Sequence, residues 1–197
     1  LIKCAQAAAS SHFVQAYSII QVSDLTIRNK IAELLDNPKH IIEAPLYFVF
    51  VADLSREYQI TQHHGLEMGS LESEALLIAT VDTALAAQNM MIAAESLGLG
   101  GVYTGVLRNT PEEISKILNL PDRTFALFGL CLGYPSKVNE VKPRLQVDEV
   151  LHINQYDTAK SIKNLIEYDK VMEAYYLQRS SNNKTEKWTD QMAHYFS

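Results

Sequence analysis

The sequence predicts an α+β domain built around one long helix, and three observations support this class. Residues 75–97 are almost all apolar or small, which indicates a helix that is buried on nearly all sides. Residues 46–52 and 124–132 are continuous apolar runs, which are typical of strands inside a sheet. Segments with helical capping signals lie between these strands and after them. A chain of 197 residues is long enough for one substantial core, so we expect residues 1–197 to form a single domain.

A membrane span is the main alternative for the long apolar helix, because its length would suffice. Asp82, Asn89 and Glu95 interrupt the apolar run, and neither a basic flank nor an aromatic belt accompanies it. We therefore expect the central helix of a domain that does not enter a membrane. Its extensive apolar surface and small residues suggest a subunit interface.

The other elements are predicted from local signals. Asp24 is a suitable N-cap for a helix that ends before the break at Asp36, Asn37 and Pro38. Asn109 is expected to cap the helix that contains Pro111 near its start. The predicted helices cover residues 1–9, 24–35, 55–64, 72–97, 112–118, 159–179 and 184–196, and the predicted strands cover residues 16–22, 46–52, 102–107 and 124–132.

Three closely spaced glycines follow the long helix and suggest two interpretations. Gly98, Gly100 and Gly101 lie beside a helix terminus, as in a dinucleotide-binding fingerprint. That fingerprint needs a strand, a glycine turn and then a helix, whereas here the glycines end a helix and precede a strand. Capping of the helix C-terminus is therefore the better interpretation.

The composition excludes several classes of function. A formal net charge of -6 without a basic patch argues against nucleic-acid binding. Cys4 and Cys131 are the only cysteines, and Cys131 lies in an apolar run, where we expect a buried free thiol. Two isolated cysteines without a signal peptide indicate a cytoplasmic protein. The chain starts at Leu1 in what reads as the end of a helix, so we expect further N-terminal residues before it.

No catalytic side-chain motif is visible, but an enzyme without one can still act if a cofactor carries the reaction. Neither a G-x-S-x-G nor an H-E-x-x-H motif occurs. His63 and His64 are adjacent on a predicted helix, so they point to different faces and are not expected to bind a metal. In such an enzyme the protein binds and orients the cofactor.

Residues 93–109, AAESLGLGGVYTGVLRN, resemble the characteristic segment of the FMN-dependent nitroreductase superfamily. The similarity is greatest to its branch of NADPH-flavin oxidoreductases and oxygen-insensitive NADPH nitroreductases. It continues in order along nearly the whole chain, in SSHFVQAYSII (10–20), FVFVADLSREYQ (48–59), FALFGLCLGYP (125–135), VKPRL (141–145) and YDKVMEAYYLQRSSNNKTEKWTDQ (168–191).

The resemblance implies a nitroreductase-like fold with a mainly antiparallel sheet surrounded by helices. It also implies a homodimer with the long helix at the interface and with FMN bound between the chains. The implied reaction is ping-pong: NADPH or NADH reduces the bound FMN, and the flavin then passes two electrons to an acceptor. Nitroaromatics, quinones, azo compounds and free flavin are the expected small-molecule acceptors, and neither nucleic acid nor a membrane is an expected partner.

The resemblance also implies which residues form the site, and it assigns each group a role. The Lys142-Pro143-Arg144 triplet is expected to hold the FMN phosphate or the pyrimidine side of the flavin, although such a triplet is otherwise usual in a solvated loop. Arg179 and Lys184 are expected to bind the 2′-phosphate of NADPH, the alternative being a solvated helix end. His12 and Phe13 are expected at the open face of the flavin, where substrate stacks. The remaining expected cofactor contacts are Ser10, Ser11, Gln15, Tyr103, Thr104, Gly105 and Val106.

Four departures from the family pattern keep two alternatives open. An H-R-S-x-R-type motif is absent, Pro38 stands where a flavin-contacting glutamine is frequent, and Val106 replaces a second glycine. The C-terminal extension of the family is also shorter here, so we expect the full-length protein to be longer at both ends. The alternatives are a sister flavoenzyme with another reaction, and a non-enzymatic flavin-binding protein or pseudoenzyme.

Overall fold

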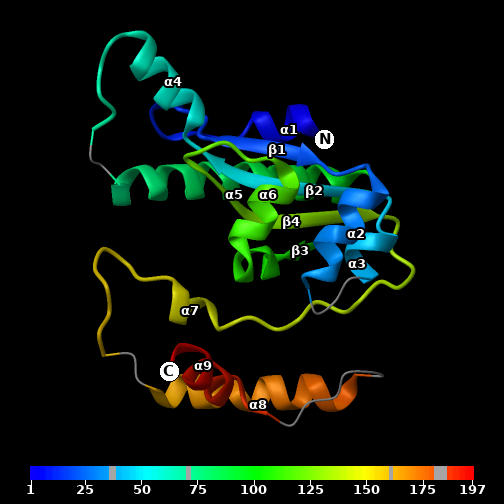
Figure 1. Cartoon of the computed structure of the whole chain (residues 1–197). Helices are drawn as coiled ribbons and strands as arrows, with labels where there is room; N and C mark the ends of the chain where they lie inside the picture. The colour runs from blue at the N-terminus through cyan, green and yellow to red at the C-terminus, as the bar shows by residue number, and fades with distance from the viewer. Residues whose placement is uncertain (36–38, 70–71, 160–161, 180–185) are drawn as a thin grey trace. The chain divides into compact units, whose positions relative to one another are not determined.

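A computed structural model of the chain divides into two compact units, Leu1–Lys137 and Val138–Ser197, each with its own internal packing (Figure 1). The first unit contains the sheet and the long helix, and the second consists of helices and loops. The described residues are 1–35, 39–69, 72–159, 162–179 and 186–197.

The sheet of the first unit is antiparallel throughout, as predicted. Its strands are β1 (Tyr17–Gln21), β2 (Leu46–Asp53), β3 (Gly100–Thr104) and β4 (Thr124–Gly133), in the order β1-β2-β4-β3. Because neighbouring strands lie about 4.8 Å apart, the edge strands β1 and β3 are separated by three spacings, or roughly 14 Å. Segments attached to β1 and to β3 therefore belong to opposite edges of the sheet.

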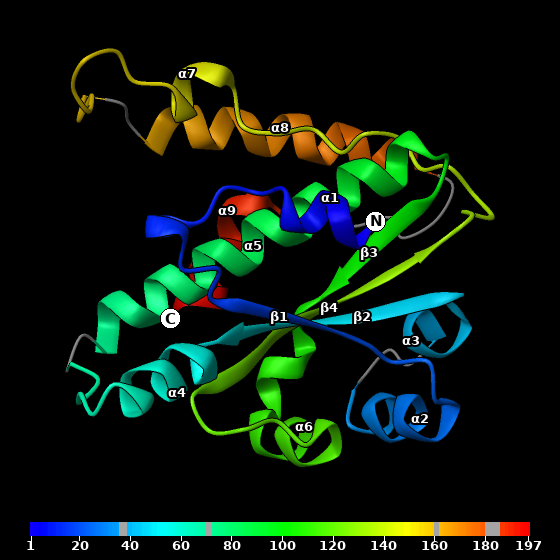
Figure 2. The same cartoon turned by 90° about the horizontal axis from the view of Figure 1, so that it is seen from above.

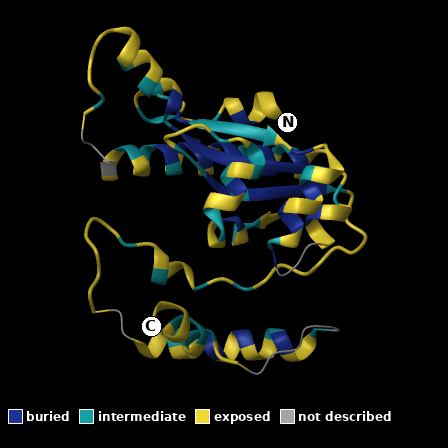
Figure 3. Cartoon of the chain, in the orientation of Figure 1, coloured by how far each residue is buried: buried dark blue, intermediate teal, exposed yellow. Residues whose placement is uncertain are grey.

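Helices cover both faces of this sheet (Figure 2). Alternate side chains of β2 point to opposite faces: Tyr47, Val49 and Val51 pack with the core around α2 and α6, whereas Phe48 and Phe50 pack with α5. This two-sided burial explains why β2 is apolar at nearly every position, and β2 and β4 are the most buried elements (Figure 3). The described helices of this unit are α1 (Ile2–Gln6), α2 (Leu25–Glu33), α3 (Lys39–Glu43), α4 (Ser55–His63), α5 (Glu72–Ser96) and α6 (Pro111–Leu118), with 3-10 turns at Ser11–Phe13 and Gly105–Asn109.

The expectation that the long helix is buried on nearly all sides is wrong for the single chain. One stripe of α5 packs on the sheet, through small residues and methionines such as Ala79, Ala86 and Met90. The opposite stripe is exposed, and its large aliphatic members recur at helical spacing. These members, Leu77, Val81, Leu85 and Ile92, form what we call the α5 outer face.

Among the described helices, α5 is the one whose length and composition would suit a membrane span. Its middle carries the buried Asp82, which accepts hydrogen bonds from a neighbouring turn, and its inner stripe packs on Phe48 and Phe50. Packing on a sheet and a buried, hydrogen-bonded carboxylate are features of a core helix, as the sequence predicted.

The end of α5 confirms the capping interpretation of the glycines. Gly98 has φ +76, the N–H of Gly98 donates to Glu95 O, and the N–H of Leu99 donates to Ala94 O. This pair of bonds is the Schellman motif, in which glycine at the left-handed position ends the helix.

Two boundaries after α5 differ from the prediction. The strand ends at Thr104, and Gly105–Asn109 forms a 3-10 turn that buries Leu107 in the core. Asn109 is not the cap of α6, because Thr110 precedes that helix and Pro111 is its first residue. An apolar residue at position 107 suits either conformation, so the pattern alone did not separate a strand from a turn.

The second unit contains α7 (Val147–Val150), α8 (Ile162–Gln178) and α9 (Trp188–Phe196). Its small core consists of Tyr168, Met172 and Tyr176 on α8, with Trp188 packed against them. Asp169 ties α9 to α8, because its carboxylate accepts from Thr189 N (3.0 Å) and Thr189 Oγ (2.6 Å). The short helices α3 and α7 were not predicted.

Candidate functional site

The turn from Ser10 to Ala16 joins α1 to β1 and is organised by Asp82 of α5. Ser10 Oγ donates to Asp82 Oδ2 at 2.6 Å, and the N–H of Ser11 donates to Asp82 Oδ1 at 3.0 Å. The N–H of Ala16 also reaches Asp82 Oδ2, at 3.2 Å. Within the turn, Ser10 Oγ accepts from the N–H of Gln15 at 2.7 Å. These bonds of Ser10 and Ser11 go to Asp82 and to the turn itself, so capping of α1 does not account for the two serines.

The backbone of this turn is strained at three residues that are not glycine. His12, Phe13 and Gln15 have φ values of 48, 59 and 57. Left-handed conformations cost residues with a Cβ roughly 1–2 kcal/mol each, and such strain concentrates at functional sites. The side chain of Phe13 is 79% exposed, so it presents an aromatic ring outward from the turn.

Arg56 of α4 holds the other end of the turn. Its Nη2 donates to Gln15 O (2.9 Å) and Tyr17 O (2.7 Å), and its Nη1 donates to Asp53 Oδ2 (3.1 Å). Burial alone would raise the pKa of Asp53, but hydrogen bonds from Ser18 and Ser55 and the charge of Arg56 hold that pKa below its usual value. The carboxylate therefore stays ionised at neutral pH and fixes the guanidinium against the turn.

A polar cavity of about 350 Å³ opens beside this turn. Gln15, Tyr17, Arg56 and Glu57 line it together with Gln6, Val14 and Ile60. Burial raises the pKa of the Glu57 carboxyl. Of the predicted site residues, Gln15 is the one that lines this cavity.

The second predicted segment, Tyr103 to Val106, lies at the edge strand β3. In the described sheet β3 pairs only with β4, so the outward backbone groups of β3 are not used by a strand. The Tyr103 ring packs edge-on against Phe128, with centroids 5.4 Å apart. A Cβ on Gly105 would lie 3.0 Å from the guanidinium nitrogens of Arg108, whose Nη1 donates to Leu127 O at 2.8 Å. Gly105 therefore makes room for Arg108 inside its own chain, a role that the sequence did not indicate.

Two predicted cations of the second unit, Lys142 and Arg179, lie over the same aromatic ring. Lys142 Nζ lies 5.4 Å from the ring centre of Tyr176, and the Arg179 guanidinium carbon lies 6.0 Å from the same ring and 5.6 Å from Tyr175. Arg144 Nη1 donates to Lys142 O at 2.6 Å. The ion pairs among the described residues involve none of these three cations. Their positive charges are therefore available to an anion.

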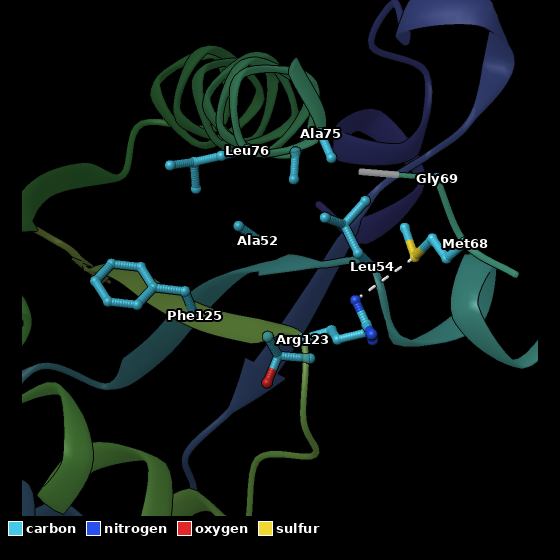
Figure 4. Close-up of a pocket in the computed structure, with 10 residues that line it drawn as sticks. Ala52, Leu54, Met68, Gly69, Ala75, Leu76, Arg123 and Phe125 are labelled. Carbon is cyan, nitrogen blue, oxygen red and sulfur yellow. Dashed lines mark hydrogen bonds between the residues drawn. The ribbon is translucent and has the colours of Figure 1, made fainter. Parts of the chain in front are cut away.

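An apolar cavity of about 270 Å³ lies near the start of α5 (Figure 4). Leu54, Leu76 and Phe125 line it, and Arg123 stands at one side with its guanidinium 3.8 Å from Met68 Sδ. None of the predicted site residues lines this cavity.

The predicted residues thus form three local groups. Ser10, Ser11, His12, Phe13 and Gln15 belong to the turn, and Tyr103 to Val106 span the end of β3 and the start of the 3-10 turn after it. Lys142 and Arg179 lie over Tyr176, and Arg144 bonds to the backbone of Lys142. Within the first unit the turn and the β3 segment belong to opposite edges of the sheet. Lys184 and Pro38 lie outside the described residues. No group of three or more His, Cys, Asp or Glu side chains suited to a metal was found among the described residues.

Comparison with known proteins identifies the protein family of this chain. Residues 1–134 match the family described as "Nitroreductase family", and residues 142–197 match "Nitroreductase family, C-terminal domain". The chain belongs to the nitroreductase family. The sequence resemblance and the predicted fold class are therefore confirmed.

Several relatives within the nitroreductase family match nearly the whole chain. A "CR(VI) reductase" of Pseudomonas sp. (strain G-1) is 47% identical over 98% of this chain and 79% of the relative. An "Oxygen-insensitive NADPH nitroreductase" of Salmonella typhimurium is 42% identical over 96% of this chain and 77% of the relative. A solved structure of a nitroreductase from B. subtilis superposes with a TM-score of 0.93 at 38% identity, covering 99% of this chain and 81% of that one. An NADPH:FMN oxidoreductase from Vibrio harveyi, complexed with NAD+, gives 0.86 at 36% identity, covering 99% and 79%.

The residues of this nitroreductase fit an FMN-type cofactor. A phosphate needs cations without a carboxylate partner, and Lys142 and Arg144 meet that need. A flat ring edge needs backbone N–H donors that no neighbouring strand uses, and the edge strand β3 offers them. An exposed aromatic side chain, Phe13, is available for stacking.

Proposed function

We propose that this chain is an FMN-dependent NAD(P)H oxidoreductase that reduces nitroaromatics, quinones or free flavin by two electrons. The observation that carries the proposal is membership of the nitroreductase family along the whole chain, with relatives named as NADPH nitroreductase, FMN reductase and NADPH-flavin oxidoreductase at 38–42% identity. When bound, FMN supplies the two-electron redox chemistry, and no side chain of the protein has to serve as a nucleophile.

The side chains then have binding and orienting roles. Lys142 and Arg144 would hold the FMN phosphate, and Tyr176 beneath Lys142 limits where that cation can lie. The backbone N–H groups near Gly105 would donate to the edge of the flavin ring and stabilise negative charge there. The Ser10–Ala16 turn would border the open face, with Phe13 stacking on an aromatic acceptor.

We propose a homodimer in which each flavin is bound by both chains. The turn leads into β1 and the β3 segment lies at β3, and these edge strands of one sheet are roughly 14 Å apart, so one flavin is more readily held by the turn of one chain and the β3 segment of its partner. The α5 outer face is a row of exposed large aliphatic side chains that a second copy would cover. The expected setting is the cytoplasm.

Arg179→Ala is expected to raise the KM for NADPH by roughly 10- to 100-fold while changing the KM for the acceptor much less. A charge-assisted hydrogen bond to a phosphate contributes about 1.5–3 kcal/mol, which corresponds to that range. Steady-state kinetics with NADPH and NADH separate the effects, because NADH lacks the 2′-phosphate. Lys170→Ala on α8, the helix that ends just before Arg179, is the matched control, since Lys170 pairs with Glu167. An unchanged KM for NADPH in Arg179→Ala would remove Arg179 from the coenzyme site.

The test of the proposed function is the visible spectrum of the purified full-length protein before and after anaerobic addition of NADPH. We expect a yellow protein that NADPH bleaches and that a nitroaromatic recolours. Yellow protein that NADPH does not bleach would favour the sister flavoenzyme. A colourless protein that also fails to take up added FMN would contradict the flavoenzyme proposal and favour a pseudoenzyme.

A further inference from the structure

We infer that Asp82 is a positioning residue for the flavin site: its carboxylate holds the Ser10–Ala16 turn in the strained form that Ser10, Ser11 and Phe13 need to meet cofactor and acceptor. The inference rests on the proposed function, because the turn's role at the flavin is part of that proposal. The inference adds to the proposed site a residue of α5, which does not belong to the turn.

The geometry of Asp82 is that of a side chain committed to the turn. The residue is 1% exposed, and it lies in the middle of α5 among residues that otherwise pack on the sheet. Both of its oxygens accept bonds from the turn: Oδ1 from Ser11 N, and Oδ2 from Ser10 Oγ and Ala16 N. A buried carboxylate is costly unless it is hydrogen-bonded, and here the turn supplies those bonds.

The bonds are made at the two ends of the strained segment. Ser10 and Ser11 precede His12, and Ala16 follows Gln15, so one carboxylate clamps both sides of the residues with positive φ. Ser10 Oγ adds a bond inside the segment, because it also accepts a hydrogen bond from Gln15 N. Without these acceptors the turn would relax towards ordinary right-handed or extended conformations.

Packing within the chain accounts for only part of this turn. Val14 and Ala16 pack into the core, but His12, Phe13 and Gln15, the three residues with positive φ, are all exposed, so their own side chains gain no burial from the strained backbone. Strain that is maintained by a buried charge and presents an aromatic ring outward indicates a preorganised binding element.

The direct test is Asp82→Asn in the full-length protein, with the Kd for FMN measured by flavin fluorescence. Asparagine keeps the volume, but its amide group must face an N–H or the Ser10 hydroxyl proton, so at least one clamp bond is lost. We expect the Kd to rise at least about 10-fold with a changed spectrum of the bound flavin. Thr83→Val is the matched control, because Thr83 is the next buried residue of α5 and its hydroxyl bonds to Ala79 O (2.6 Å) and Val51 O (3.5 Å) and not to the turn. Its Kd should stay within about twofold of the wild type.

A double-mutant cycle with Ser10→Ala tests whether Asp82 acts through the turn. Because Asp82 and Ser10 share a hydrogen bond, the increase in Kd for the double variant should be well below the product of the two single increases. Thr83→Val with Ser10→Ala should give the simple product. A simple product for Asp82→Asn with Ser10→Ala would overturn the inference.

Amide hydrogen exchange on the wild-type protein gives a second reading that needs no variant to fold. The amides of Ser11, Gln15 and Ala16 should be protected in the FMN-free protein as strongly as in the FMN-bound protein, because Asp82 and Ser10 already hold them. Protection that appears only with FMN would overturn the inference.

The two proposals fail in different ways. If Asp82→Asn lowers the Tm but leaves the FMN Kd and spectrum unchanged, Asp82 is only structural, and the proposed function stands. If the wild-type protein does not bind FMN at all, the proposed function fails and the role of Asp82 at a flavin fails with it. In that case the exchange data still report whether Asp82 orders the turn.

Discussion

Replacing both Lys142 and Arg144 by alanine is expected to raise the Kd for FMN by roughly 10²- to 10⁴-fold, so that the protein loses its flavin during purification. The reason is that each cation can contribute about 1.5–3 kcal/mol to a phosphate through charge-assisted bonds. Both side chains are exposed and outside the small core of the second unit, so the Tm of the flavin-free protein should hardly change. Flavin content per chain, read from the absorbance spectrum, measures the outcome.

The control variant loses the same number of positive charges at other positions. Lys163→Ala with Lys170→Ala removes two positive charges from α8 of the same unit, and both of those lysines are exposed. Flavin content in this control should match the wild type, and the difference between the two double variants should shrink in high salt. If the Lys142 and Arg144 variant retained its flavin, the phosphate would have to be bound elsewhere.

Placing aspartates on the α5 outer face, as Val81→Asp with Leu85→Asp, is expected to give monomers that also lack FMN. Burying even one unpaired carboxylate in an apolar interface costs several kcal/mol, so the dimer Kd should rise at least about 10³-fold. Flavin is lost together with the dimer because each site is proposed to need the turn of one chain and the β3 segment of the other. Size-exclusion chromatography with a light-scattering detector measures the mass of each species, and a visible-absorbance detector on the same column measures its flavin content.

Leu25→Asp is the matched control for the interface variant. Leu25 is also an exposed leucine of the first unit, but it lies on α2 and not on the α5 outer face. We expect this protein to remain a flavin-bound dimer. A variant at positions 81 and 85 that stays dimeric would place the interface on another surface, and a monomer that keeps its flavin would show that one chain forms the site.

The sequence predicted correctly those parts of the fold in which a local pattern is compatible with only one structure. Continuous apolar runs predicted β2 and β4, because strands buried on both faces have no polar side. Asp24 was correctly predicted as the N-cap of α2, since its carboxylate accepts from the N–H groups of Thr26 and Ile27. The glycine cap after α5 was predicted from the order of elements.

The errors arise where the same residues suit more than one arrangement. Apolar composition shows that a helix face avoids water, but not whether the same chain or a second copy covers it, so the burial of α5 was overestimated. The Ser10–Ala16 turn contains no glycine, so nothing in its sequence indicated three residues with positive φ. Asp82 was interpreted only as evidence against a membrane span. A carboxylate amid apolar helix residues also predicts a hydrogen-bonding partner, and that signal could have pointed to the turn.

The opposite-edge placement of the turn and the β3 segment has a genetic consequence under the two-chain site proposed above. One allele with a damaged turn and another with a damaged β3 segment would each encode an inactive protein. A mixed dimer of the two products would pair the intact turn of one chain with the intact β3 segment of the other. Such a cell would regain one working site per mixed dimer, so the two alleles would complement each other although they lie in the same gene.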